Sequence, residues 1–172
     1  MNKTRKLILC AMLISTALVL SYMERFFPLQ MLIPLPGVKL GLANIVSLMA
    51  LYLLGTKEAY IILAIRCVLG SMFGSSITGL LFSLTGGMLS MLTMSLARHL
   101  PFLSIYGVSI LGAAAHNIGQ ILASMLLMQS LYIGAYLPYL LCIAIATGLA
   151  TGAASAGVLR TLTHTDRKTL GL

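Results

Sequence analysis

The stretch Ala59-Tyr-Ile-Ile-Leu-Ala-Ile-Arg66-Cys-Val-Leu-Gly70 decides what kind of fold this chain adopts. It is a continuous apolar run interrupted by a single arginine, far from any polar end. In a membrane helix a charge at such a position costs at least about 2.5 kcal/mol, and residues that carry this cost are usually functional. The stretch therefore predicts a membrane-embedded helix that carries a binding site.

The composition of the whole chain supports the same conclusion. Hydrophobic residues make up 59% of its 172 residues and charged residues only 8%, whereas a soluble domain has about 25% charged residues. Strands of a membrane barrel would alternate polar and apolar residues. The apolar runs here are continuous and rich in Leu, Ile, Ala, Met and Gly. We expect an all-α integral membrane protein that forms a single transmembrane domain over residues 1–172.

Six apolar runs are predicted to be transmembrane helices. Each is long enough to cross a hydrocarbon core about 30 Å thick, the third only just. They cover residues 7–23, 38–54, 59–73, 77–97, 104–128 and 135–159. The first run follows a basic N-terminus and resembles a signal peptide, but no Ala-x-Ala cleavage site follows it, so we expect a retained helix.

The distribution of basic residues predicts the orientation. With the N-terminus inside, the outer segments carry only Arg25 and Lys39. The cytoplasmic segments then carry Lys3, Arg5, Lys6, Lys57, Arg98, Arg160, Arg167 and Lys168. We therefore expect both termini, residues 1–6 and 161–172, in the cytoplasm. The net charge of +8 lies at segment ends and not on one basic face, so no nucleic-acid partner is expected.

The longest outer segment, residues 24–37, contains Pro28, Pro34 and Pro36. Prolines remove backbone donors and restrain their neighbours, so this segment is not expected to be regular helix. Two interpretations stay open: the segment lies at the membrane interface, or it folds back over a cavity as a lid.

A small set of polar residues falls inside the predicted helices or at their outer ends. The residues expected to bind substrate are Lys39, Asn44, Arg66, His116, Asn117 and Gln120. His116 and Gln120 are four residues apart and share a helix face, whereas Asn117 is rotated by about 100°. The alternative is structural: Arg66 snorkels or binds backbone carbonyls, and the three polar residues of the fifth helix form an interhelical network.

The acidic residues bear on what Arg66 binds. Glu24 and Glu58 lie at segment ends and Asp166 lies in the tail, so no predicted span contains a carboxylate. An internal counter-ion is therefore not expected, and an anionic ligand would supply the charge that a buried guanidinium needs.

Enzymatic chemistry is not expected. The predicted spans contain no paired carboxylates, no nucleophile–base motif and no P-loop. Cys10, Cys67 and Cys142 lie within apolar runs without metal-ligand spacing, so we expect packing residues and neither a metal nor a cofactor.

Small residues recur every four positions on several helices, a pattern that lets helices approach closely in lipid. One series lies on the last predicted helix and is Ala144, Gly148, Gly152 and Ala156. Another lies on the fifth and is Gly112, His116, Gln120 and Ser124. On the first helix Ala11 and Ser15 repeat the spacing, which allows packing or the docking of a partner.

Several motifs carry a resemblance to a known family. They are the segment from Pro36 to Val46 (Pro-Gly-Val-Lys-Leu-Gly-Leu-Ala-Asn-Ile-Val), the Arg66 segment, Ser83-Leu-Thr-Gly-Gly87 and His116-Asn-Ile-Gly-Gln120. Over residues 7–160 the chain resembles the family called "Gx transporter" or "heptaprenyl diphosphate synthase component I". That family in turn resembles the substrate-binding S components of energy-coupling factor (ECF) transporters.

The resemblance to S components implies six helices with cytoplasmic termini and a substrate site near the outer face, closed by the first outer loop. It also implies docking to a transmembrane coupling subunit and two ATPases. S components often carry small alanine-type residues on the first helix for this docking; Ala11 and Ser15 are the candidates here, although Ser15 departs from an all-alanine pattern.

The synthase part of the family's description makes a separate prediction. Prenyl diphosphate synthases hold magnesium through aspartate-rich motifs, and the only aspartate of this chain is Asp166 in the polar tail. A catalytic prenyltransferase role is therefore not expected, although the description leaves a link to isoprenoid or quinone metabolism open.

The leading hypothesis is an S component in a bacterial-type plasma membrane that captures a small anionic metabolite from outside. A vitamin, an isoprenoid phosphate and a quinone precursor all suit the expected site. Two alternatives are a stand-alone secondary transporter and a non-catalytic membrane subunit of isoprenoid or quinone biosynthesis.

Overall fold

The computed structural model describes residues 2–26, 41–73 and 77–169, without the side chains of Arg25 and of residues 163–169. This part of the chain is helical, as predicted. The α-helices are α1 (Lys3–Met23), α3 (Asn44–Leu53), α4 (Thr56–Met72), α5 (Ile77–Ala97), α6 (Ile105–Met128) and α7 (Leu137–Thr169). Two short 3₁₀ segments, η1 (Glu24–Phe26) and η2 (Leu131–Tyr136), follow α1 and precede α7.

Helix length separates the six α-helices into two groups. Four helical segments are long and apolar enough to cross a membrane: α1, α5, α6 and the stretch Leu131–Leu162 that contains most of α7. At 1.5 Å per residue, the 17 residues of α4 extend only about 26 Å and the 10 residues of α3 only about 15 Å. Among the described residues the second predicted span is thus a half-length helix. Four membrane-length helices are established, and six spans remain a prediction.

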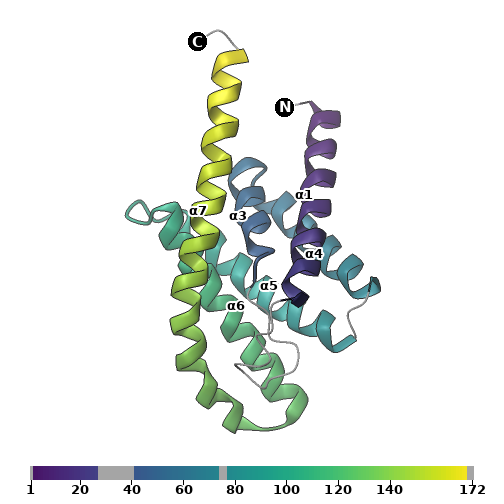
Figure 1. Ribbon diagram of the computed structural model, residues 1–172, viewed down its shortest axis with the longest axis vertical. Helices are drawn as coiled ribbons and strands as arrows, with labels where there is room; N and C mark the ends of the chain where they lie inside the picture. Colours follow the sequence, from purple (N-terminus) through teal and green to yellow (C-terminus); the bar gives the residue numbers. More distant parts are fainter. Residues whose placement is uncertain (1, 27–40, 74–76, 170–172) are drawn as a thin grey trace.

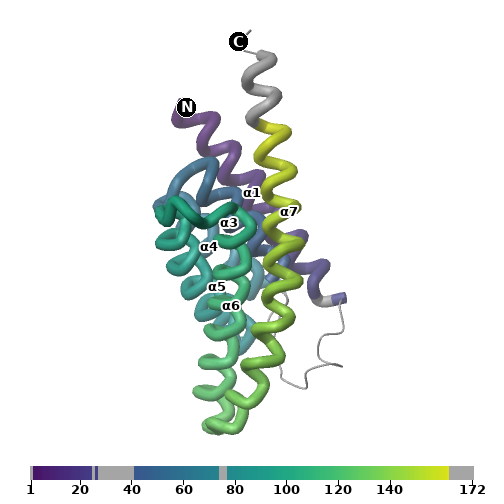
Figure 2. Tube along the Cα trace, turned by 90° about the vertical axis from the view of Figure 1, so that its left-hand side faces the viewer, coloured from purple at the N-terminus to yellow at the C-terminus, as the bar shows by residue number. Residues whose placement is uncertain are grey.

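The chain runs back and forth along the long axis of the bundle. The N-terminal end of α1 and the C-terminal end of α7 lie at the same end in two perpendicular views (Figures 1 and 2). We call it the terminal end. α6 packs between α5 and α7, while α1 packs against α4 and α3. The short helix α3 also contacts α5, α6 and α7, so it lies centrally.

Glycines set how closely α6 approaches its two neighbours. A Cβ at Gly119 would lie 2.7 Å from the carbonyl oxygen of Thr85 on α5, and one at Gly148 of α7 would lie 2.6 Å from Cα of Ile110. These are backbone-to-backbone approaches that a side chain would prevent. The small-residue series on the last helix therefore packs closely against another helix, as predicted, and that helix is α6.

Most described charged side chains lie at the terminal end. Lys6 on α1 forms an ion pair with Glu58 at the start of α4. Arg98, just after α5, donates from Nη1 to the carbonyl oxygen of Leu51 near the end of α3 at 2.7 Å. The positive-inside prediction requires such a one-ended distribution, and the described residues have it. Which side of a membrane this end faces is a separate matter and stays a prediction.

Candidate functional site

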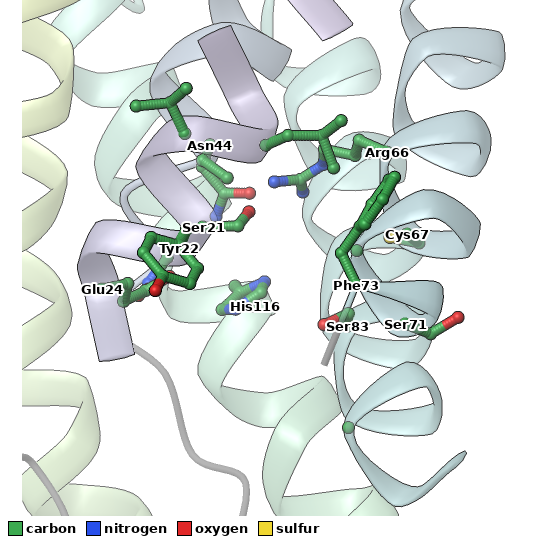
Figure 3. Close-up of a pocket in the computed structure, with 16 residues that line it drawn as sticks. Ser21, Tyr22, Glu24, Asn44, Arg66, Cys67, Ser71, Phe73, Ser83 and His116 are labelled. Atoms are coloured by element: carbon green, nitrogen blue, oxygen red, sulfur yellow. The ribbon is translucent and has the colours of Figure 1, made fainter. Parts of the chain in front are cut away.

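A cavity of about 290 Å³, shown in close-up in Figure 3, is lined near the ends of α1 and α4 that point away from the terminal end. The end of α1, the start of α3, the second half of α4, the first turns of α5 and the middle of α6 all contribute to its wall. Leu18, Val19 and Phe73 are among its apolar residues. Its polar and charged side chains include Ser21, Glu24, Asn44, Arg66, Ser83 and His116.

Arg66 faces this cavity and does not snorkel to the bundle surface. Its side chain comes from the second half of α4, and the residue is only 7% exposed. It makes no hydrogen bond or ion pair with any residue of the described ranges, and its Nε is buried without a partner. A buried donor in this condition costs about 1–3 kcal/mol, and more when it is charged. The guanidinium therefore keeps unused hydrogen-bonding capacity at the cavity.

Asn44 reaches the cavity because α3 begins there. Gly41 has φ 81°, a left-handed conformation that favours glycine, and its carbonyl accepts the N–H of Asn44 at 2.8 Å. This turn starts the helix in the middle of the bundle. Asn44 is 7% exposed and its Oδ1 has no hydrogen-bond partner. The positive end of the α3 dipole thus lies at the cavity wall, next to an amide with an open acceptor.

His116 is held between two glycines, one on α5 and one just before α3. A Cβ at Gly86 of α5 would lie 2.9 Å from both Cε1 and Nδ1 of the imidazole, and one at Gly41 would lie 3.3 Å from its Cδ2. The residue is 4% exposed and lines the cavity. The glycines of two sequence motifs are therefore explained by the space that one imidazole needs.

Asn117 and Gln120 do not line the cavity. The Nδ2 of Asn117 donates to the carbonyl oxygen of Leu140 at 2.8 Å, which ties α6 to α7. Gln120 is fully buried, and its backbone carbonyl accepts from the hydroxyl of Ser124 at 3.0 Å. Their placement favours the structural alternative for these two residues, while Asn44, Arg66 and His116 are brought together.

The remaining predicted site residues lie elsewhere. Lys39 is outside the described residues. Ala11 and Ser15 lie on the exposed side of α1, where the Ser15 hydroxyl donates to the carbonyl oxygen of Ala11 at 3.0 Å. They are therefore exposed on the surface of the bundle.

Glu24 is the cavity residue that sequence reasoning missed. The sequence places it at a segment end, outside the predicted spans, but it is only 6% exposed and lines the cavity. Its Oε1 accepts the backbone N–H groups of Gly41 and Leu42, the latter at 3.4 Å. It also acts electrostatically on Arg66. The expectation of no internal counter-charge is thus corrected, although Glu24 forms no direct ion pair with Arg66.

The geometry of the site suits the binding of a polar group. Figure 3 shows the Arg66 guanidinium and the Asn44 amide directed into the same space, with the His116 ring below them. Within residues 2–26, 41–73 and 77–169 no three His, Cys, Asp or Glu side chains are grouped as metal ligands would be. Its described lining residues provide one cation, one acid, an imidazole, an amide and hydroxyls over an apolar wall.

Comparison with protein families gives one match. The family model described as "Heptaprenyl diphosphate synthase component I" matches residues 13–158. No curated protein and no solved structure matches the chain.

Proposed function

The chain belongs to the heptaprenyl diphosphate synthase component I family, and from this premise and the geometry of its cavity we propose that it is a substrate-binding S component of an ECF-type uptake transporter. In this role it captures a small anionic metabolite and is not itself an enzyme. The single observation that carries the proposal is Arg66, a buried guanidinium that faces a cavity without a hydrogen-bond partner in the described chain.

The position of the cavity supports capture from outside. The basic side chains gather at the terminal end, and the positive-inside rule assigns such an end to the cytoplasm. The cavity is lined near the ends of α1 and α4 that point away from this end, and these then face the exterior of a bacterial-type plasma membrane. In this topology all six α-helices cross or enter the membrane, with α3 as a half-length second span, and both termini are cytoplasmic.

Uptake needs an energy source that the chain does not supply by a P-loop of its own. We therefore place a transmembrane coupling subunit and two ATPases beside it. The exposed side of α1 with Ala11 and Ser15 is the proposed docking surface, because small residues allow the close approach of another membrane helix.

Two experiments test this function. In the first, the tagged chain is coexpressed with a coupling subunit and two ATPases, and copurification of all three with the chain is expected. In the second, mass spectrometry identifies small molecules retained after gentle purification, and their binding is compared between the wild type, Arg66→Gln and the control Arg160→Gln, which removes an exposed arginine at the terminal end. Loss of binding only in Arg66→Gln supports the proposal. Equal binding by all three proteins removes Arg66 from the site, and ATPase-independent uptake into liposomes favours a stand-alone transporter.

The family description favours a second candidate, a non-catalytic membrane subunit in isoprenoid or quinone synthesis. Copurification with a prenyl diphosphate synthase instead of an ECF module would support this candidate over the first.

A further inference from the structure

We propose that the cavity selects a compact monocarboxylic acid that carries a hydrogen-bond donor next to its carboxylate, and not a polyprenyl diphosphate. This inference rests on the binding role proposed above and narrows the class of substrate. The volume of the cavity, the charges of its lining and its unsatisfied hydrogen-bonding atoms each restrict the ligand.

The volume of the cavity limits the size of the ligand. An engineered protein cavity of about 150 Å³ accommodates a benzene ring. The cavity here, about 290 Å³, is roughly twice as large, which corresponds to about a dozen non-hydrogen atoms on the same scale. A polyprenyl chain of seven isoprene units has about three times that number, so it cannot be enclosed.

The charges around the cavity limit the charge of the ligand. Among the described residues that line it, Arg66 is the only Lys or Arg and Glu24 is the only Asp or Glu. Because both side chains line the same cavity, their opposite charges partly offset each other. With Arg66 and Glu24 both charged, a monoanion leaves the described lining with one excess negative charge, whereas a diphosphate leaves at least two. A planar carboxylate also matches the fork of guanidinium donors.

The unsatisfied atoms define what else the ligand must offer. The Nε of Arg66 requires an acceptor and the Oδ1 of Asn44 requires a donor, and both atoms are buried without a partner. The two side chains are directed into the same space (Figure 3). An acid with a neighbouring hydroxyl or N–H group satisfies both side chains, whereas a simple carboxylate leaves Asn44 unsatisfied. The α3 N-terminus beside Asn44 adds a positive potential that favours the acid.

Cys67 provides a direct readout of occupancy, since it lines the cavity next to Arg66. In a Cys10→Ala protein, the alkylation of Cys67 by iodoacetamide is followed by mass spectrometry, with the exposed Cys142 outside the cavity as an internal reference. The probes are mandelate, its 2-methoxy analogue, other paired 2-hydroxy and 2-methoxy acids of similar size, and geranyl diphosphate.

We expect 2-hydroxy acids to protect Cys67 at concentrations about tenfold lower than their 2-methoxy analogues, because a buried hydrogen bond to Asn44 is lost in the latter. In Asn44→Leu the members of each pair should become equivalent, and in Arg66→Gln protection by both should fall at least about tenfold. The labelling of Cys142 should not change.

Three outcomes overturn the inference: no acid protects Cys67, the paired acids are equivalent in the wild type, or geranyl diphosphate protects at a lower concentration than every acid. The comparison of paired acids on the wild-type protein decides the question even if Asn44→Leu does not fold. Copurification with a coupling subunit tests the transport role independently, so a chain that copurifies but prefers the diphosphate refutes only the ligand class.

Discussion

Replacing Gly119 by alanine tests the helix crossing that supports the cavity. An ideal Cβ at this position lies 2.7 Å from the carbonyl oxygen of Thr85 and 2.8 Å from Cα of Gly86. Ordinary contact begins at 3.4 Å, so α5 and α6 must separate by about 0.7 Å, since backbone atoms cannot rotate away. Overpacking of this kind typically costs about 1–3 kcal/mol.

A matched control isolates this cost. At Gly157 of α7 a Cβ would have nothing within 4 Å, so Gly157→Ala changes only the intrinsic helix preference, which favours alanine by up to about 1 kcal/mol. The same preference acts in Gly119→Ala and cancels in the comparison. We therefore expect Gly119→Ala to be less stable than Gly157→Ala by at least about 1 kcal/mol.

The assay is unfolding in mixed micelles by increasing sodium dodecyl sulfate, followed by circular dichroism. Because His116 lies one turn before Gly119, the separation of the helices should also weaken ligand protection of Cys67 in Gly119→Ala and leave it unchanged in Gly157→Ala. Equal stability of the two variants would refute the close backbone approach of α5 and α6.

Three further predictions concern charged side chains. Arg66→Met should stabilise the unliganded protein in the same unfolding assay by about 1–3 kcal/mol, since it removes a buried guanidinium that lacks a partner; a loss of stability would contradict this. Arg98→Gln should cost about 1.5 kcal/mol, because its hydrogen bond to the Leu51 carbonyl is lost, and it should leave ligand protection of Cys67 unchanged. The hydrogen bond from Lys6 lowers the pKa of Glu58 below its ordinary value of 4.5. The ionised Glu58 should therefore stabilise the fold above pH 4.5, and this stabilisation should be lost as the pH falls through the lowered pKa. Lys6→Gln should remove this pH dependence of unfolding.

The membrane-length helices could be predicted from the sequence because a bilayer makes simple demands on a chain. The predicted span 77–97 coincides with α5 (Ile77–Ala97), and the span 104–128 differs from α6 (Ile105–Met128) by one residue. Both runs end where polar or helix-breaking residues follow, namely Arg98 and the left-handed Gln129. Hydropathy identifies such helices since their whole length must be apolar.

The half-length α3 could not be predicted in the same way. Residues 41–43 are as apolar as the helix that follows them, so hydropathy gives no signal for a helix start at Asn44. The start depends on the left-handed Gly41 and on backbone N–H groups that are satisfied by a side chain distant in the sequence. Glycine in an apolar run is a weak indication of such a turn, because most glycines in membrane helices serve packing.

For a similar reason, the sequence could not show which of the predicted residues on α6 line the cavity. The helical positions of His116 and Asn117 differ by about 100°, so both cannot face one cavity equally. Which residue faces it depends on the position of α7, whose Leu140 carbonyl accepts from Asn117. Sequence spacing separates the two faces of α6, but only the packed bundle assigns one of them to the cavity.

Glu24 accounts for both the start of α3 inside the bundle and the shape of the cavity wall beside it. A helix that starts within a membrane exposes backbone N–H groups that lipid cannot satisfy, and each unsatisfied group costs several kcal/mol. Glu24 accepts two such donors from the turn that precedes α3, those of Gly41 and Leu42. The carbonyl oxygens of the same turn accept the first N–H groups of the helix, those of Asn44 and Ile45. The acid therefore holds the turn from which α3 starts. A Glu24→Gln protein should keep Arg66 in the cavity but hold α3 less firmly, so ligand affinity should fall together with stability. Arg66→Gln separates the two effects, because it removes affinity without loosening α3.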